Sequence, residues 1–295
     1  MAEGAPASPK PLRHVVITGR SGFIGRRLAQ RLEGEGVSVS GVSRANGIDV
    51  TRGFLPLEGA DHVYHLGGLS FVPDAWADPS AYYFTNTYGT VRVLDQCRQA
   101  GIPVTFVSTY VYGSSAPIPV SEKTPPNPNN PYAFSKLAAE DACRFYARTF
   151  GLEVSILRLF NAYGPGQGAS FLIPTIARQA VDRDCREIVV ADLSPRRDFI
   201  HVDDVVDALR AAPRLPRGEA FNVGSGRSHS VQNVIEACLS AANVAKPFRA
   251  RDERRANEVP DVVADISALS AAIGWRPQIA FEAGIRTVIE AMKPC

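Results

Sequence analysis

A short apolar segment that runs directly into a glycine-rich turn constrains the fold of this chain more than any other feature. Residues 14–18 (HVVIT) are mostly apolar on both faces, as a strand in a sheet covered on both sides requires. The turn GRSGFIG (19–25) follows, and residues 23–34 carry apolar side chains at helical spacing. A strand, a tight turn and a helix in this order open a βαβ unit.

The alternation of strands and helices continues along the chain. Runs rich in β-branched residues predict further strands, and periodic segments between them predict helices. We therefore expect an α/β fold, with a Rossmann-type doubly wound parallel sheet and a smaller, mostly C-terminal substrate-binding lobe. The expected strands cover residues 37–43, 62–66, 104–108, 154–160, 187–192 and 221–223, and the expected helices residues 84–100, 132–149, 171–182 and 201–212.

The glycine-rich turn has the composition of a phosphate-binding loop. Glycine permits a tight turn and a close approach of the backbone to a pyrophosphate, and the following helix offers free N–H groups and a positive dipole. The spacing is GxxGxxG rather than GxGxxG, and a turn that only joins strand to helix is the alternative. We expect a dinucleotide to contact Gly19, Ser21, Gly22, Phe23, Ile24 and Gly25.

The end of the second expected strand bears on the choice of dinucleotide. An NAD site usually carries Asp or Glu about 20 residues after the turn, where the carboxylate bonds the ribose 2′-hydroxyl. Here the strand ends in Val42-Ser43-Arg44, and a hydroxyl followed by a guanidinium suits a 2′-phosphate. NADP(H) is therefore favoured over NAD(H), although Arg44 is alternatively a solvated loop charge. Asp49 and Val50 are weaker candidates for the adenine side.

Tyr132 and Lys136 form the pattern YxxxK in a segment that Pro131 opens as a helix. Residues four apart share one helix face, so the phenol and the ammonium enter the same pocket. A phenol has a pKa of about 10, and we expect the nearby cation to lower the pKa. Tyr132 then exchanges a proton at a carbinol carbon beside the nicotinamide. The pattern is common by chance and gains its weight from the glycine-rich turn and from a hydroxyl pair upstream.

Ser108 and Thr109 supply that hydroxyl pair, at the end of the expected strand 104–108. A hydroxyl at the carboxyl end of this strand can donate a hydrogen bond to the oxygen of a reacting carbonyl and stabilise the negative charge that develops there. The residues alone do not distinguish the two, so both are candidates for the catalytic hydroxyl.

Several segments, in the same order and spacing, resemble extended short-chain dehydrogenases/reductases that act on nucleotide sugars. The resemblance covers residues 14–290 and is greatest to GDP-4-keto-6-deoxymannose reductases. The family's usual HLAA reads HLGG here, and its STxxVYG is one residue shorter. The matching segments are TGRSGFIG (18–25), HLGG (65–68), STYVYG (108–113), PYAFSK (131–136), RLFNAYGPG (158–166), RRDFIHVDDV (196–205), FNVGSG (221–226) and RRANEVP (254–260).

The resemblance implies roles that the residues alone do not. It favours Thr109 as the catalytic hydroxyl, and it places two arginines on the diphosphate of a nucleotide-diphosphate sugar. A surface ion pair is the alternative for each arginine, and a structural role is the alternative for Asn86. The implied cofactor contacts are Leu66, Gly67, Gly68, Asn86, Val107, Leu159, Tyr132 and Lys136. The implied substrate contacts are Ser70, Thr109, Tyr132, Asn161, Arg197 and Arg255.

The choice of reaction depends on two positions. Dehydratases that resemble this chain place an acidic residue after the catalytic hydroxyl, where this chain has Tyr110, and epimerases commonly carry an acidic residue at strand two. We therefore expect an NADPH-dependent 4-ketoreductase acting on a nucleotide-linked 4-keto-6-deoxy sugar. The alternatives are an NAD-dependent 4-epimerase of a UDP- or dTDP-sugar and, more remotely, a non-catalytic NADP-binding regulator.

Composition excludes several other classes of protein. The net charge of +2 does not suggest a nucleic-acid or membrane partner, and no apolar run reaches the ~18 residues of a membrane helix. The five cysteines form no CxxC and the five histidines do not cluster at metal-ligand spacing, so we expect no metal and a reducing, cytoplasmic location. A homodimer through 84–100 and 132–149 is implied by resemblance only.

The regular alternation of strands and helices gives way to shorter elements after about residue 162, which suggests two lobes. We expect residues 1–13 to be a disordered tail and residues 14–165 to be the NAD(P)-binding domain, with elements near 201–223 returning to its sheet. Residues 166–200 and 224–295 are then the substrate-binding lobe.

Overall fold

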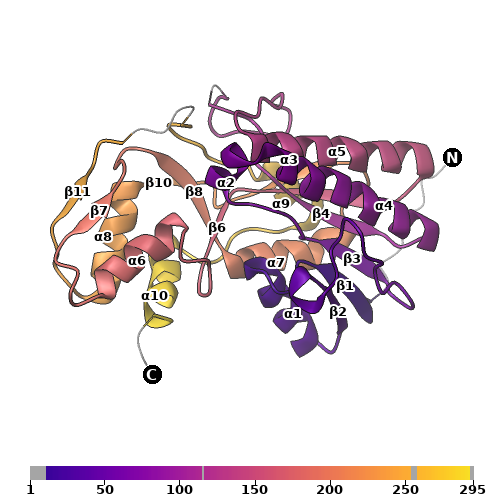
Figure 1. Cartoon of the computed structure of the whole chain (residues 1–295), viewed down its shortest axis with the longest axis horizontal. Coiled ribbons are helices and arrows are strands. Elements are labelled where there is room, and N and C mark those ends of the chain that lie inside the picture. The colour runs from indigo at the N-terminus through magenta and orange to yellow at the C-terminus, as the bar shows by residue number, and fades with distance from the viewer. Residues whose placement is uncertain (1–10, 115, 254–257, 293–295) are drawn as a thin grey trace.

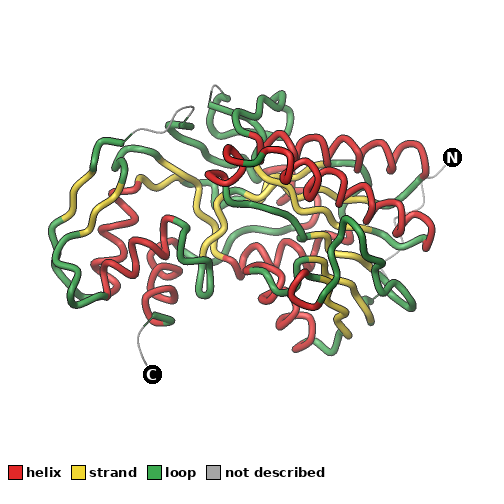
Figure 2. The backbone as a smooth tube through the Cα atoms, viewed as in Figure 1, coloured by secondary structure: helices red, strands yellow, loops and turns green. Residues whose placement is uncertain are grey.

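Six parallel strands form the main sheet of the protein, in the order β2-β1-β3-β4-β5-β9 (Figures 1 and 2). The computed structural model describes residues 11–114, 116–253 and 258–292. The sheet confirms the predicted α/β class and parallel architecture. Its strands are β1 (His14–Thr18), β2 (Ser38–Val42), β3 (His62–His65), β4 (Val104–Thr109), β5 (Val154–Leu159) and β9 (Ala220–Val223).

Helices cover both faces of this sheet, which explains why its strands are apolar on both sides. One face packs against α1 (Phe23–Gly34), α7 (Val202–Ala211) and α9 (Ser267–Ile273). The other face packs against α4 (Gly89–Ala100) and α5 (Pro131–Phe150), which run side by side in Figure 1. Shorter elements join them: η1 (Arg44–Asn46), α2 (Val72–Ala77), α3 (Pro79–Tyr82), η2 (Tyr83–Tyr88) and η3 (Ala212–Arg214).

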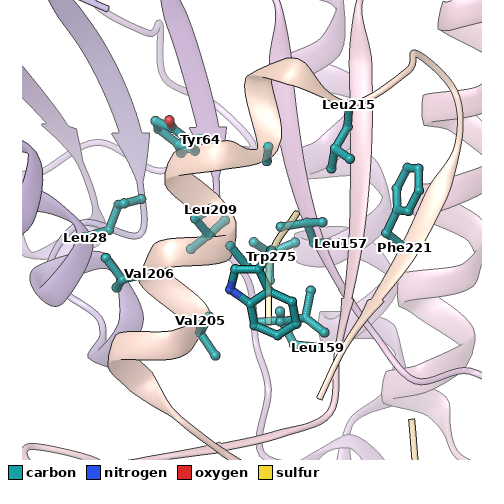
Figure 3. Packing of buried hydrophobic residues seen from close by; sticks show 14 of the residues in the cluster. Leu28, Tyr64, Leu157, Leu159, Val205, Val206, Leu209, Leu215, Phe221 and Trp275 are labelled. Atoms are coloured by element: carbon teal, nitrogen blue, oxygen red, sulfur yellow. The ribbon is translucent and has the colours of Figure 1, made fainter. Parts of the chain in front are cut away.

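The core under α7 is completed by a residue from late in the chain. Trp275 lies beside Val205 and Leu209 of α7 and Leu159 of the sheet (Figure 3). Its indole N–H donates to the carbonyl oxygen of Asp204 at 3.1 Å, so the polar atom of the ring is satisfied. The first and last parts of the chain therefore share one hydrophobic core.

A smaller lobe lies at the left of Figure 1 and has its own core. It holds a three-stranded sheet, in the order β10-β8-β6, and a parallel pair, β7 with β11. The strands are β6 (Asn161–Tyr163), β7 (Ile188–Val190), β8 (Arg196–His201), β10 (Ser228–Ser230) and β11 (Phe248–Ala250). The helices are α6 (Leu172–Val181), α8 (Val231–Ala242) and α10 (Phe281–Glu290).

The structure differs from the sequence-based expectation mainly in this lobe. Residues 161–163, which lie between the expected strand 154–160 and the expected helix 171–182, pair as β6 with β8, and β8 itself was not predicted. These strands are three to six residues long and are defined by partners distant in the chain, so local periodicity carries little signal for them. No described helix is long and apolar enough to cross a membrane. The proposed domain boundaries stay predictions.

Candidate functional site

A deep cavity lies at the carboxyl ends of the main sheet and is lined by residues of both lobes. β1 has β2 on one side and β3 on the other, so the chain reverses its direction of winding there. The crevice at such a switch point is where open α/β sheets bind ligands. The cavity volume of about 1270 Å³ exceeds the roughly 300–1,000 Å³ of a typical small-molecule site, which leaves room for a dinucleotide and a second ligand.

The glycine-rich turn forms one wall of the cavity, and geometry requires its glycines. Gly19 has a φ of +72°, in the left-handed region, and a Cβ there would lie 2.9 Å from the backbone N of Gly67. A Cβ on Gly25 would overlap the carbonyl oxygen of Gly19. Gly22 is the N-cap of α1, so the N–H groups that start this helix lie at the cavity wall. The turn therefore fits a pyrophosphate, which needs a close backbone and N–H donors.

The loop 66–68 after β3 forms the neighbouring wall, and Asn86 lies behind it. The Asn86 side chain accepts from the backbone N of Leu69 at 2.8 Å and donates to Leu69 O at 3.0 Å. It also donates to Ser135 Oγ of α5 at 2.9 Å. Asn86 is fully buried and does not line the cavity, so the structure does not show the expected cofactor contact. Its amide instead ties the loop to α5.

The end of β2 lies outside the cavity lining and carries two guanidinium groups. Ser43 caps η1, and Arg44 is exposed on this short helix. Arg20 of the glycine-rich turn, which the sequence analysis did not select, lies across the strand: a Cβ on Gly41 would overlap its side chain. Arg20 Nη2 is 2.7 Å from Glu33 Oε1 in a half-exposed ion pair. Both arginines therefore lie near the end of β2, the part of such a sheet that in dinucleotide-binding folds faces the ribose.

Three other expected cofactor contacts also lie outside the cavity lining. Ser21 is exposed on the glycine-rich turn. The Asp49 carboxylate accepts from the backbone N and the hydroxyl of Thr51 at 2.8 and 2.7 Å, and these bonds lower the pKa of Asp49. Val50 is buried beneath Gly89. The two residues of the 49–50 segment thus serve the local fold in this structure.

Helix α5 places Tyr132 and Lys136 in the cavity, one helical turn apart, as the YxxxK spacing predicts. Asn130 caps the helix by accepting from the backbone N of Ala133 at 2.9 Å. Pro131 occupies the first helical position, where no N–H partner is needed. The Lys136 ammonium lies over the ring of Phe106 at 4.2 Å from the ring centre. The two residues therefore point from one helix face toward the carboxyl end of β4.

Burial controls the charge of both groups. It raises the pKa of Tyr132 to about 12, although a side-chain hydrogen bond with Thr109 lowers the pKa. Burial lowers the pKa of Lys136 to about 8, against smaller opposing effects of Cys143 and Glu140. The pKa of Tyr132 therefore lies above its ordinary value and not below it as expected, because the loss of hydration is the largest effect on this phenol. At neutral pH Tyr132 is a phenol and therefore a proton donor.

The two hydroxyls at the end of β4 have different partners. Ser108 Oγ donates to Glu140 Oε1 at 2.6 Å, and Ser108 is 2% exposed. Thr109 lines the cavity beside Tyr132, and its side chain acts to lower the pKa of that phenol. Adjacent strand residues point to opposite faces, so a single strand cannot present both hydroxyls to one ligand in the same way. The geometry favours Thr109 as the hydroxyl beside the reacting oxygen.

The expected substrate side is lined by Ser70, Asn161 and Arg197. The Arg197 guanidinium is already engaged, since it donates to the carbonyl oxygen of Val259 at 2.6 Å and pairs with Glu258. Glu258 also lines the cavity and was not selected from the sequence. Arg255 lies outside the described residues.

Three aromatic side chains of the cavity were also missed. Phe71 precedes α2 and Phe171 precedes α6, and their rings meet edge to face with centres 5.8 Å apart. Trp76 of α2 is 53% exposed and lines the same cavity. Phe71 and Phe171 come from different lobes, so their contact closes the cavity between the two. Isolated aromatic residues beside helix starts carry no motif by which a sequence could be searched.

Most of the sequence-predicted site residues do meet around this cavity. Among the described residues, no group of three or more His, Cys, Asp or Glu is arranged to hold a metal ion. The predicted residues that line the cavity are Gly19, Gly22, Phe23, Ile24, Gly25, Leu66, Gly67, Gly68, Ser70, Val107, Ser108, Thr109, Tyr132, Lys136, Leu159, Asn161 and Arg197.

A protein-family model matches the part of the chain that builds this site. The model describes the NAD dependent epimerase/dehydratase family and matches residues 15–224. The chain belongs to this family. The match confirms the resemblance to extended short-chain dehydrogenases/reductases and establishes an NAD(P)-dependent enzyme of the nucleotide-sugar epimerase, dehydratase and reductase group.

Individual relatives include both reductases and epimerases. The chain is 32% identical to the GDP-6-deoxy-D-mannose reductase of Pseudomonas aeruginosa over 292 residues, which covers 94% of this chain and 96% of the relative. A solved structure of RMD from Pseudomonas aeruginosa complexed with NADPH has a TM-score of 0.87 at 32% identity, covering 95% and 98% of the chains. The UDP-glucose 4-epimerase of Mycolicibacterium smegmatis is 30% identical over 310 residues, covering 93% and 97%.

Proposed function

We propose that this protein uses NADPH to reduce the 4-keto group of a nucleotide-linked 4-keto-6-deoxy sugar, in the manner of a GDP-4-keto-6-deoxymannose reductase. The observation that carries the proposal is the pair of guanidinium groups, Arg20 and Arg44, at a β2 end without a carboxylate. Guanidinium binds phosphate well, so this end of the site favours the 2′-phosphate of NADP(H). Cells hold NADPH as a consumable reductant, which suits net reduction.

The residues of the cavity divide the proton chemistry between them. A bound NADPH supplies the hydride that C4 of the sugar receives. Tyr132, a phenol at neutral pH, gives its proton to the C4 oxygen, and Thr109 donates a hydrogen bond to the same oxygen as charge develops. The Lys136 ammonium stabilises the phenolate left on Tyr132 and holds the nicotinamide ribose.

The position after Thr109 argues against dehydration. Tyr110 occupies it, and its ring is stacked on Phe160 with centres 5.2 Å apart. An elimination across C5 and C6 needs an acid or base there, and a phenol packed against another ring is poorly suited to that task.

The proposal is tested with purified protein, NADPH and a GDP-4-keto-6-deoxy sugar, by following the absorbance of the reduced nicotinamide. We expect consumption of NADPH and formation of the 4-hydroxy sugar. Replacing both Arg20 and Arg44 with Ala should lower the preference for NADPH over NADH by roughly 10–100-fold, the value of one charge-assisted hydrogen bond or more. No loss of reduced nicotinamide, with a substrate shown to be active on another reductase, would refute the proposal.

An NAD-dependent 4-epimerase of a UDP- or dTDP-sugar is the second candidate, because a UDP-glucose 4-epimerase is almost as similar to this chain as a reductase is. Such an enzyme would carry tightly bound NAD and interconvert two sugars without added cofactor. A non-catalytic NADP-binding regulator is disfavoured, since both Tyr132 and Lys136 line the cavity.

We also propose a homodimer through η2, α4 and α5. Exposed aromatic side chains gather on these elements: Phe84 stacks on Tyr88, and Phe145 meets Phe150 edge to face. All four are 44–49% exposed. A second copy of the chain would cover this apolar surface. Light scattering coupled to size exclusion should give twice the mass of the chain, and charged replacements of Phe84 and Phe145 should return the monomer.

A further inference from the structure

Behind the catalytic helix lies a buried ion pair that the proposed reaction does not use. Glu140 follows Lys136 by one turn of α5, and its side chain is fully buried. Arg158 of β5 is 2% exposed and donates to both Glu140 oxygens, with Nε to Oε1 at 2.9 Å and Nη2 to Oε2 at 2.6 Å. The partly exposed Arg144 donates to Oε2 at 2.8 Å. The free-energy penalty of removing two charges from water can exceed the gain from their attraction. Stability alone is therefore a weak explanation for this buried ion pair.

The same carboxylate also reaches the catalytic strand. Glu140 Oε1 accepts the hydroxyl of Ser108 at 2.6 Å, directly before Thr109 in the chain. Arg158 Nη1 donates to the hydroxyl of Tyr112 at 2.9 Å, and that hydroxyl donates to Asn222 Oδ1 at 2.6 Å. The network therefore joins α5, β4, β5 and β9, and it sets the position of the catalytic strand against the catalytic helix.

Burial disfavours the positive charge of Lys136, so the groups around the ammonium decide how much of that charge is kept. From β3 it faces His65, which is neutral because burial lowers its pKa to about 3. From β4 it faces the ring of Phe106, and on α5 the thiol of Cys143 acts on it. Glu140 is the carboxylate that acts on the Lys136 ammonium, and Arg158 and Arg144 lie on the far side of that carboxylate.

We propose that Glu140 is a positioning residue for the reaction. Its carboxylate keeps Lys136 protonated. It also holds the Ser108 hydroxyl in the buried network, so that Thr109 is the hydroxyl presented to Tyr132. The proposal rests on the proposed function for its chemical meaning, because both Lys136 and Thr109 matter only if a carbonyl is reduced. Its test does not depend on turnover.

The protonation of Lys136 is measured directly by NMR. Protein labelled with ¹³C and ¹⁵N in lysine is titrated with base, and Lys136→Arg identifies the Lys136 signal. The lysines of the chain are Lys10, Lys123, Lys136, Lys246 and Lys293. We expect wild-type Lys136 to titrate at about 8 and Glu140→Gln to titrate lower by about one unit, the shift that a neighbouring opposite charge produces. Glu140→Asp keeps the charge and should remain closer to wild type.

Asp141→Asn is the matched control for the carboxylate. Asp141 is the next residue of α5 and also pairs with Arg144, at 3.1 Å, but its side chain is 70% exposed. Its replacement should leave the Lys136 titration unchanged. Glu140→Gln strands Arg158 in the core, so a double variant with Arg158→Met removes both charges and keeps the protein folded; its Lys136 should still titrate below wild type.

The pH profile of NADPH consumption gives a second measurement. Its high-pH limb should move to lower pH in the Gln variants and stay in place in Asp141→Asn. A Lys136 that titrates equally in wild type, Glu140→Gln and the double variant would overturn the inference. If wild-type protein reduces no keto sugar, the proposed function fails, while the NMR titration still decides the role of Glu140.

Discussion

The two sides of the cavity differ in the atoms that line them: backbone on one side and side chains on the other. The proposed cofactor side is made of backbone: glycines 19, 25, 67 and 68 pack so closely that an added Cβ would collide with neighbouring atoms. The proposed substrate side is made of large side chains: Phe71 and Phe171 meet across the two lobes, and Arg197 is held by the carbonyl oxygen of Val259. Backbone recognition tolerates almost no change, whereas side-chain recognition is adjustable, so one cofactor site can serve many substrates.

Adding one methyl group should break the cofactor side completely. We expect Gly25→Ala to abolish NADPH binding, because its Cβ would overlap the carbonyl oxygen of Gly19 and push the turn apart. Gly34→Ala is the matched control: it ends the same helix, and nothing lies within 4 Å of its added Cβ. Nicotinamide fluorescence titration measures both. Normal NADPH affinity in Gly25→Ala would show that the turn does not hold the pyrophosphate.

Removing the phenol should stop the chemistry and leave both sides of the cavity intact. Tyr132→Phe should lower kcat by roughly 10²–10⁴-fold, the usual contribution of a positioned proton donor, with unchanged affinity for NADPH. Tyr146→Phe, on the same helix but outside the cavity lining, should retain wild-type kcat. Steady-state kinetics with saturating NADPH distinguish the two. Equal rates in both variants would remove Tyr132 from the mechanism.

Truncating a cation should weaken only the substrate side. Arg197→Ala should raise KM for the nucleotide sugar by roughly 10–100-fold, since charge-assisted hydrogen bonds contribute about 1.5–3 kcal/mol each. The affinity for NADPH should not change. Arg249→Ala, in the same lobe and in an exposed pair with Glu187, is the control. A variant whose NADPH affinity falls with its sugar affinity would mean that the two sides are not independent.

The smallest expected effect is the dependence of turnover on pH. It concerns Lys136, which in the proposed function acts on both the cofactor and the reacting sugar. Lys136 is charged below its pKa of about 8, so turnover should be full at lower pH and fall as pH rises through that value. The loss should be roughly tenfold between about pH 7 and about pH 9, as for any single proton. Lys136→Arg stays protonated over this range and, though slower, should give a flat profile. A rate that climbs above pH 8 would contradict an ammonium requirement.

The glycine-rich turn could be predicted because its requirements are local. A glycine that must allow a left-handed φ or a close backbone contact cannot be replaced, so strand, turn and helix leave a readable pattern at residues 14–34. Most main-sheet strands were also readable, since burial on both faces makes them largely apolar. The short strands β6, β8 and β10 escaped, because their pairing partners are remote in the chain.

The rest of the site depends on contacts that a sequence does not display. Arg20 was passed over because its position across Gly41 follows from the packing of the turn on β2. The pKa of Tyr132 was misjudged because a motif shows the cation and not the depth of burial. Asn86 matched the family's pattern, yet its side-chain amide is hydrogen-bonded to Leu69 and Ser135 within the protein. Glu140 lies in the same helix as the YxxxK pattern and became visible only through its partners on β4 and β5.

The placement of β9 at the outer edge of the main sheet has a consequence for biosynthesis. Residues 220–223 pair with β5 only after three strands of the smaller lobe have left the ribosome, and Trp275 covers the core later still. Until then the nascent chain exposes the unpaired edge of β5, and such an edge is a template for association with other chains. During translation the main sheet therefore has one unpaired edge and an incompletely covered core. β9 pairs with that edge and Trp275 covers that core only when the late segments have been synthesised. Nascent chains stalled before β9 are where a chaperone would be needed most.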